Sequence, residues 1–115
     1  MALSALARQF AAEISNHDWS DAPYRTDRAG HARSMDSGPT RQLEPNETDA
    51  VRMNAMWVTA QVLGYQDPSL DLFEFAEACG VNIYTLRGEK SGYITSGVRR
   101  NEQGHYAIPG TPDSY

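Results

Sequence analysis

The chain contains a single cysteine, Cys79, and a single lysine, Lys90. One cysteine excludes an internal disulfide and the multi-cysteine zinc sites, so the fold depends on a core of its own. A chain of 115 residues is long enough to bury such a core in one domain. Proteins without disulfides are typical of reducing compartments, and we therefore expect a cytoplasmic protein.

Long apolar runs are also missing. No stretch approaches the roughly 20 apolar residues that a membrane-spanning helix needs. The first residues, MALSALARQFAAEIS, are amphipathic and include Arg8 and Glu13, so we do not interpret them as a signal peptide. The sequence thus predicts no association with a membrane.

Positive charge is scarce and unevenly placed. The net charge is -5, and the first 77 residues hold 12 acids and six arginines. The remaining residues hold three acids and four bases. An acidic protein is a poor general binder of polyanions. Any contact with nucleic acid would therefore lie in the last third of the chain.

Apolar residues recur with helical spacing in three stretches and predict helices at about 2–15, 47–64 and 70–79. The second stretch, ETDAVRMNAMWVTAQVLG, begins near a cap at Asn46 or Thr48 and has Gly64 as its stop. It carries two apolar stripes, which predict that other elements pack on both sides of this central helix. The stripes are Val51, Ala55, Val58 and Val62, and Met53, Met56, Trp57 and Ala60.

The last third is rich in β-branched and aromatic residues, which predict strands at about 82–87, 92–99 and 105–108. The connections Glu89–Gly92 and Asn101–Gly104 are short polar runs that end in glycine, as hairpin turns do. We therefore expect an α+β fold of three helices followed by a three-stranded antiparallel β-meander. Residues 1–115 would form a single domain with a short tail at 109–115.

Residues 16–46 show little periodicity and many glycines and prolines, which predict a long irregular loop. Loops of this length are usually functional or disordered, and arginine and aromatic side chains dominate binding hot spots. The loop is thus our first candidate for a partner-binding site. Its candidate residues are Trp19, Tyr24, Arg25, Arg28, His31 and Arg33. The interleaved aspartates at 18, 21, 27 and 36 leave a second interpretation open, a self-paired, salt-bridged surface loop.

A second candidate site is the acidic side of the expected third helix. It would suit a basic partner surface, such as one that normally holds nucleic acid. Acids near the start of a helix are also favoured by the helix dipole alone, so a purely structural role is the other interpretation. The residues of this acidic face are Asp67, Asp71, Glu74 and Glu77.

The stretch FAEACGV, followed by Leu86 and Gly92, resembles the helix-turn-helix of the phage-repressor and Cro family. In that family a small residue stands four positions before the turn glycine and an apolar residue six after it, as Ala76, Gly80 and Leu86 do here. Leu72 and Lys90 stand where that family has glutamine and glutamate. The resemblance implies a recognition helix over 82–87, or a winged variant, whereas the local residues favour a strand. The DNA-binding candidates on this alternative are Asn82, Ile83, Tyr84, Arg87, Arg99 and Arg100.

Signatures of catalysis are weak. His17 and His31, with nearby aspartates, match no metal-ligand spacing, and no nucleophile-elbow sequence is present. We expect no enzyme, no metal and no cofactor. The preferred function is a small non-catalytic binding protein that contacts a larger protein or protein complex, as a monomer or homodimer. Phages and mobile elements encode many accessory and inhibitor proteins of this size, and the alternative is a DNA-binding transcriptional regulator.

Overall fold

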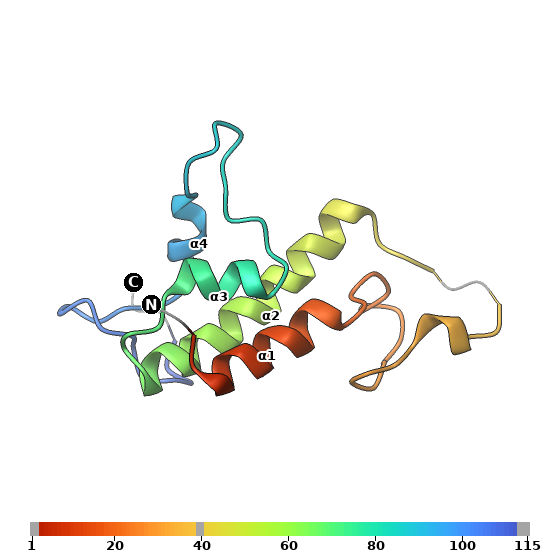
Figure 1. Cartoon of the computed structure of the whole chain (residues 1–115), viewed down its shortest axis with the longest axis horizontal. Coiled ribbons are helices and arrows are strands. Elements are labelled where there is room, and N and C mark those ends of the chain that lie inside the picture. Colours follow the sequence, from red (N-terminus) through yellow and green to blue (C-terminus); the bar gives the residue numbers. More distant parts are fainter. Residues whose placement is uncertain (1–2, 39–40, 113–115) are drawn as a thin grey trace.

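The computed structural model describes residues 3–38 and 41–112, and its regular elements are helices (Figure 1). Helix α1 spans Ala5–Asn16, α2 spans Pro45–Gln66, α3 spans Leu72–Ala78 and α4 spans Gly92–Ser96, with a 3-10 turn, η1, at Arg33–Met35. The three helices that the sequence predicts are therefore present with shifted ends. Residue 2 of the first one lies outside the described residues, as do 113–115 of the expected tail.

Helix α1 forms because a good cap precedes a regular apolar face. The Ser4 hydroxyl oxygen accepts a hydrogen bond from the Ala7 backbone nitrogen at 3.1 Å, which satisfies one of the free N–H groups at the helix start. Ala7, Ala11 and Ile14 recur at helical spacing and are buried. These small side chains allow α1 to pack closely against both α2 and α3.

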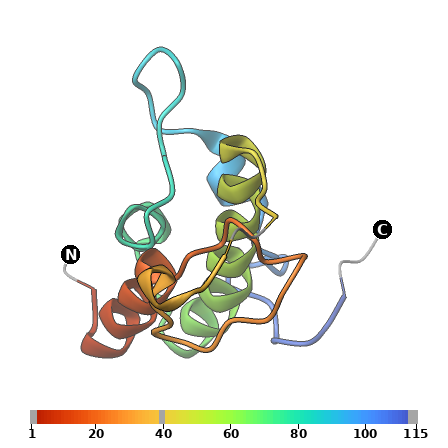
Figure 2. The same ribbon diagram turned by 90° about the vertical axis from the view of Figure 1, so that its right-hand side faces the viewer.

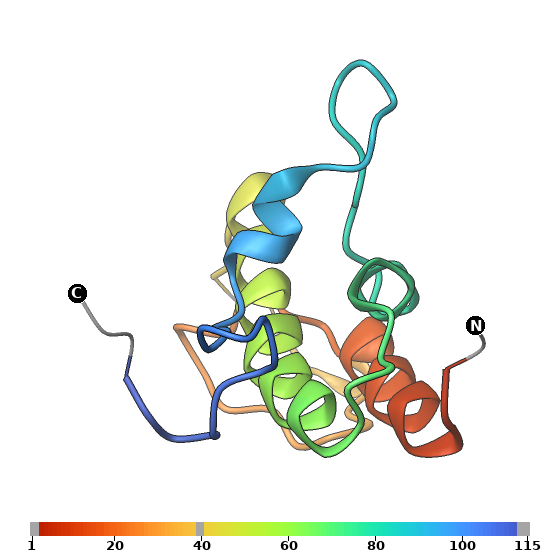
Figure 3. The same ribbon diagram turned by 90° about the vertical axis from the view of Figure 1, so that its left-hand side faces the viewer.

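Helix α2 is the longest element and begins at Pro45, two residues earlier than predicted, so the expected caps lie inside it. Met56 and Ala60 are fully buried on one side. Figure 3 shows α1 and α3 on one flank of this buried side and α4, with the segment after it, on the other. The opposite side is uncovered, because Val58 is 72 % and Val62 is 45 % exposed. The prediction that both stripes are packed is therefore wrong.

Gly64 does not stop α2, which continues for two more residues. It is buried beneath the ring of Tyr106, and a Cβ built on Gly64 would lie 2.4 Å from Tyr106 Cζ. The glycine is therefore required for a close approach between the C-terminal segment and the helix. A glycine inside a helix is easily mistaken for its end when its packing partner is far away in the sequence.

The described residues contain no sheet, so the predicted β-meander and the α+β fold class are wrong. Residues 92–99 begin with α4, which Ser91 caps by accepting a hydrogen bond from the Tyr93 backbone nitrogen at 3.3 Å. Ile94 and Val98 are buried, whereas Tyr93, Thr95 and Ser96 are exposed, so the alternation of a strand is broken at Ser96. Buried residues four apart are typical of a helical turn, whereas a strand buries every second residue. This spacing and the serine cap override the β-branched composition.

The other two expected strands are reduced to the isolated bridges Tyr84–Lys90 and Arg100–Tyr106. The turn over 101–104 lies where the sequence predicts it, and the Asn101 side-chain oxygen stabilises it by accepting two backbone N–H groups at 3.0 Å each. The first turn lies over 85–88 and not over 89–92. Residues 82–88 are not helical either, so the recognition helix implied by the repressor resemblance is not formed.

A buried amide connects the C-terminal segment to α2. The Gln61 side chain donates from Nε2 to the carbonyl oxygens of Arg99 and Ala107, at 3.1 Å each, and its Oε1 accepts from the Arg99 backbone nitrogen at 2.7 Å. Only 5 % of Gln61 is exposed. One side chain thus satisfies three backbone groups that a sheet would otherwise pair.

Replacing Gly64 with alanine should lower the free energy of unfolding by about 1–3 kcal/mol, because the added methyl group would overlap the Tyr106 ring. In an unobstructed helix the same change would stabilise by up to about 1 kcal/mol. Urea unfolding measures the difference. Gly92→Ala is the matched control, because nothing lies within 4 Å of its Cβ position, and it should not destabilise. Wild-type stability of Gly64→Ala would show that Tyr106 does not pack there.

Gln61→Leu should also destabilise the protein, because leucine, which is of similar size, leaves the Arg99 backbone N–H and the Ala107 carbonyl without their partner, while the Arg99 carbonyl still accepts from the Ala107 backbone nitrogen. Each buried polar group left unsatisfied costs about 1–3 kcal/mol. Chemical denaturation would measure the lower stability. A change in the NMR chemical shift of the Arg99 backbone amide would report the lost hydrogen bond. Gln66→Leu, at the exposed end of α2, is the control. Equal stabilities of the two variants would show that the hydrogen bonds of Gln61 to the C-terminal segment do not stabilise the fold.

Candidate functional site

The loop after α1 is held by charged side chains around a buried carboxylate. Asp21 has no exposed surface, although it lies in a loop. Arg33 donates one hydrogen bond from each terminal nitrogen to the two oxygens of Asp21, and its Nε donates to Asp18 Oδ2 at 2.6 Å. A buried carboxylate is tolerated only when it is paired in this manner. Arg33 therefore holds the loop together.

Arg25 forms the second half of the cluster. Its Nη2 lies 2.6 Å from Asp27 Oδ1 and 2.9 Å from Asp36 Oδ2, and its Nε lies 3.1 Å from Asp21 Oδ2. His31 Nε2 lies 2.7 Å from Asp36 Oδ1 and 2.9 Å from Arg25 Nη2. The structure therefore shows the self-paired loop that the sequence left open as its second interpretation.

The cluster shifts the pKa values of its members toward their charged forms. Hydrogen bonds from Arg33 lower the pKa of Asp18 and of Asp21, against the opposing effect of burial. The hydrogen bond from Arg25 lowers the pKa of Asp36 in the same way. The carboxylates in turn raise the pKa of both arginines. All these shifts favour an ionised cluster at neutral pH.

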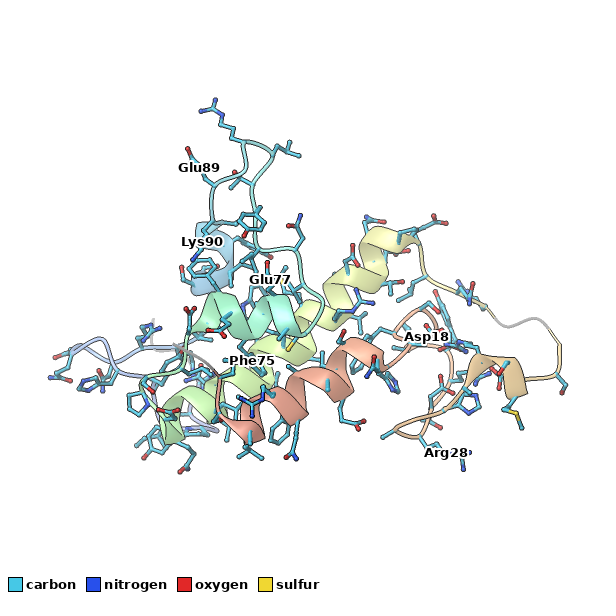
Figure 4. The ribbon with its side chains drawn as sticks, in the orientation of Figure 1. Asp18, Arg28, Phe75, Glu77, Glu89 and Lys90 are labelled. Carbon is cyan, nitrogen blue, oxygen red and sulfur yellow. The ribbon has the colours of Figure 1, made fainter. Side chains whose placement is uncertain are left out.

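Four of the six loop residues nominated for partner binding are engaged within the protein. Three of them are members of the cluster. The fourth, Trp19, is half-buried, and its Nε1 donates to the carbonyl of Ile14 at 2.9 Å. Tyr24 and Arg28 remain exposed, together with Met35, which is 78 % exposed. Figure 4 shows Arg28 at the outer edge of the loop.

Residues 82–91, which we call the arm, project away from the helices between α3 and α4 (Figures 1 and 3). The base of the arm is fixed to the body. Ile83 is buried, and its carbonyl accepts a hydrogen bond from the Ser91 backbone nitrogen at 2.8 Å. The Lys90 ammonium lies 5.2 Å from the centre of the Phe73 ring on α3, and Figure 4 shows Lys90 nearer to the helices than Glu89.

The tip of the arm is an ordered turn. The Thr85 backbone nitrogen donates to the Glu89 carbonyl at 2.7 Å, and the Thr85 hydroxyl oxygen accepts from the backbone nitrogens of Arg87 and Glu89 at 3.3 Å each. Gly88 has a φ of 82°, in the left-handed region that glycine adopts without steric cost. The turn fixes Leu86 in full exposure, at 109 % of its reference surface.

A fully exposed leucine on an ordered turn is a candidate for binding that the sequence did not predict. Leu86 was placed as the apolar residue of a helix-turn-helix, where it would be buried. The signal that could have found it is the run Thr85-Leu86-Arg87-Gly88, because glycine is favoured at the last position of a type I turn. An ordered turn loses little conformational entropy when it binds, which favours affinity.

Two acids of the predicted acidic face accept hydrogen bonds from backbone N–H groups at or before the start of α3. Asp71 caps α3, and its Oδ1 accepts from the Glu74 backbone nitrogen at 3.1 Å. Asp67 accepts hydrogen bonds from the backbone and the hydroxyl of Ser69. Glu77 is exposed. Two of the four acids thus have local structural roles, and a basic partner for this face stays a prediction.

The alternative DNA-binding residues do not gather on one surface. Asn82, Tyr84 and Arg87 belong to the arm, whereas the two remaining arginines follow α4 at its other end (Figure 3). The first of them, Arg99, is half-buried. The second, Arg100, has its guanidinium 4.3 Å from the centre of a tyrosine ring and donates to a carbonyl of its own turn.

Three further features of residues 3–38 and 41–112 concern metal binding, the cysteine thiol and the membrane. No group of three or more His, Cys, Asp or Glu side chains in these ranges could hold a metal ion. Cys79 is buried, and burial raises the pKa of its thiol to about 12, which keeps it protonated and unreactive. None of the helices in the same ranges has the length and hydropathy to span a membrane.

Acid should destabilise the protein through the cluster. The pKa values of Asp18, Asp21 and Asp36 are lowered in the folded state. Their contribution to stability is therefore complete above the unfolded pKa of about 3.9 and is lost as the pH falls through the folded values. Asp21→Asn should reduce the dependence of unfolding free energy on pH below about pH 4, measured by urea unfolding at a series of acidic pH values.

The matched control for that measurement is Glu102→Gln, which neutralises an exposed acid outside the cluster. Its dependence of unfolding free energy on pH should equal that of the wild type. An unchanged dependence in Asp21→Asn would show that the buried carboxylate is not coupled to folding. At neutral pH, Arg33→Ala should lower the free energy of unfolding by about 1–3 kcal/mol, because Asp21 loses its two hydrogen bonds from Arg33 and keeps only Arg25 beside it.

Comparisons of this chain with models of known protein families, with curated proteins and with solved structures found no match. Function is therefore inferred from the geometry of the chain itself. That geometry offers two exposed surfaces with side chains suited to recognition. They are the arm, with Leu86 at its tip, and the outer edge of the loop, with Tyr24 and Arg28.

Proposed function

We propose that this chain is a small non-catalytic binding protein that acts by protein–protein contact, with the arm as its main contact element. The observation that carries the proposal is the full exposure of Leu86 on a hydrogen-bonded turn. The partner is a larger protein or protein complex. Such a mode of action suits an accessory or inhibitor protein of the type that phages and mobile elements encode.

The composition of the arm favours a concave and partly apolar binding site on the partner. Burying an exposed leucine side chain contributes about 1.5–3 kcal/mol, and Figure 2 shows that the arm extends beyond the helices, where it can reach into a pocket. Arg87, exposed beside Leu86, can pair with a carboxylate at the rim of that pocket. Tyr84, 47 % exposed, adds an aromatic surface lower on the arm.

The outer edge of the loop is a second contact in this proposal. Tyr24 is 41 % exposed and has the Arg41 guanidinium 4.3 Å from its ring centre. Arg28, in the same loop, is also exposed. The charged cluster behind these side chains holds the loop in one shape, which favours binding in the same way as the ordered turn of the arm.

Leu86→Ser should weaken partner binding at least about fivefold, because truncation of a central apolar contact costs more than about 1 kcal/mol. The experiment is affinity capture from nuclease-treated cell extract, followed by a titration of the captured protein. Ile108→Ser removes an exposed apolar side chain outside both the arm and the loop and is the matched control, which should bind as the wild type does.

Three results would count against the proposal. Equal binding by Leu86→Ser and the wild type would remove the arm from the interface. Loss of binding in Arg28→Ala alone would move the contact to the loop. Capture that disappears after nuclease treatment would identify nucleic acid as the partner and revive the DNA-binding alternative.

A further inference from the structure

The segment that follows α4 contains a pocket of about 510 Å³, and we infer that this pocket binds a small phosphate monoester. We call it the Arg99 pocket. Its volume lies within the range of about 300–1,000 Å³ that small-molecule sites occupy. Both polar and apolar residues line it, and they include Arg99, Arg100, Asn101, Val98, Ala107 and Pro112.

The two arginines of the Arg99 pocket form no ion pair with an acid among residues 3–38 and 41–112. By contrast, Arg25 and Arg33 lie 2.6 Å, and Arg52 lies 2.9 Å, from an aspartate oxygen. Arg99 Nε is also buried and donates to no atom of the described residues. Buried donors are normally paired. The guanidinium of Arg99 is therefore suited to an acceptor that these residues do not supply.

The backbone of Arg99 and the side chain of Arg100 are held in place by the protein itself. The Gln61 amide bonds both backbone polar groups of Arg99, and the Ala107 backbone nitrogen donates to the Arg99 carbonyl at 2.9 Å. The Arg100 guanidinium lies 4.3 Å from the centre of the Tyr106 ring, and its Nη1 donates to a carbonyl of its own turn at 3.0 Å. A site that is formed in advance loses less entropy when a ligand binds.

The donors of the pocket favour a phosphate group over a single carboxylate. Arg99 and Arg100 remain charged at neutral pH, and a phosphate monoester carries about −1.5 to −2 charges at pH 7 with three acceptor oxygens. A guanidinium can hold two such oxygens with parallel N–H groups. Asn101 Oδ1 accepts two backbone N–H groups, which leaves its Nδ2 as a further donor. Apolar surface from Val98 and Ala107 suits the organic part of the ligand.

One acid of the pocket, Glu102, opposes an anion. Two arginines and one glutamate give the lining a net charge of +1, whereas the whole protein has a net charge of -5. The Arg99 pocket is thus a positive site on a negative protein. It includes no residue of the arm, so this inference does not depend on the proposed protein–protein contact.

Titration of the isotope-labelled protein with phenyl phosphate, followed by its amide NMR resonances, tests the inference. The amides of Asn101, Ala107 and Thr111, which line the pocket, should shift and saturate. Arg99→Gln should weaken binding about tenfold or more, because it removes a charged donor and keeps the backbone contacts of that residue. Arg87→Gln, on the arm, is the matched control and should bind as the wild type does.

Three further titrations identify the chemistry of the ligand. Benzoate, which pairs a similar ring with a single carboxylate, should bind at least several-fold more weakly than phenyl phosphate. Arg99→Lys keeps the charge without the planar fork, so its affinity should lie between those of the wild type and Arg99→Gln. Glu102→Gln should bind phenyl phosphate several-fold more tightly, because it removes the opposing charge.

Four results would overturn the inference. The first is the absence of saturable shifts at the amides of the Arg99 pocket, and the second is equal binding by Arg99→Gln and the wild type. Equal affinities for benzoate and phenyl phosphate would exclude phosphate as the preferred group. Finally, a DNA duplex that shifts the same amides at lower concentrations than phenyl phosphate would make nucleic acid the ligand.

Discussion

The C-terminal third of this protein depends on the side-chain amide of Gln61. Residues 80–112 form no sheet, so their backbone groups find partners in side chains and local turns. Gln61 holds two carbonyls and one N–H of this segment against α2, and Thr85 and Asn101 close the two turns further out. These three polar side chains add to the short-range backbone hydrogen bonds of the two turns and satisfy groups that a longer hydrogen-bond ladder would have paired.

Helices were predictable here because their signals are local. The 3.6-residue repeat identified α1, α2 and α3 to within a few residues. The prediction of strands was wrong because it also relied on local signals. Composition alone does not show whether Ile94 packs with helical or with alternating spacing. Gly64 illustrates the limit best, because its partner Tyr106 is more than 40 residues away in the sequence. Contacts between residues that are distant in the sequence thus decide where a helix ends.

The loop shows how one group of residues supports two interpretations. Arginine beside aromatic residues predicts recognition, and arginine beside aspartate predicts self-pairing. The sequence offered both, and only the burial of Asp21 shows that the pairing is used. The exposed side chains that remain candidates for recognition are Tyr24 and Arg28 in the loop and Leu86 on the arm. Leu86 was missed because an apolar residue is normally assigned to a core.

The charged cluster also constrains how this protein can vary. Asp21 and Arg33 are each other's main partners, and Arg25 connects them to Asp36. A single substitution at Asp21 or Arg33 removes the main partner of the other and changes the balance of charge in the cluster. We therefore expect substitutions at these positions to occur in compensating pairs. The pattern of charge in the loop would then be retained even where its individual residues differ.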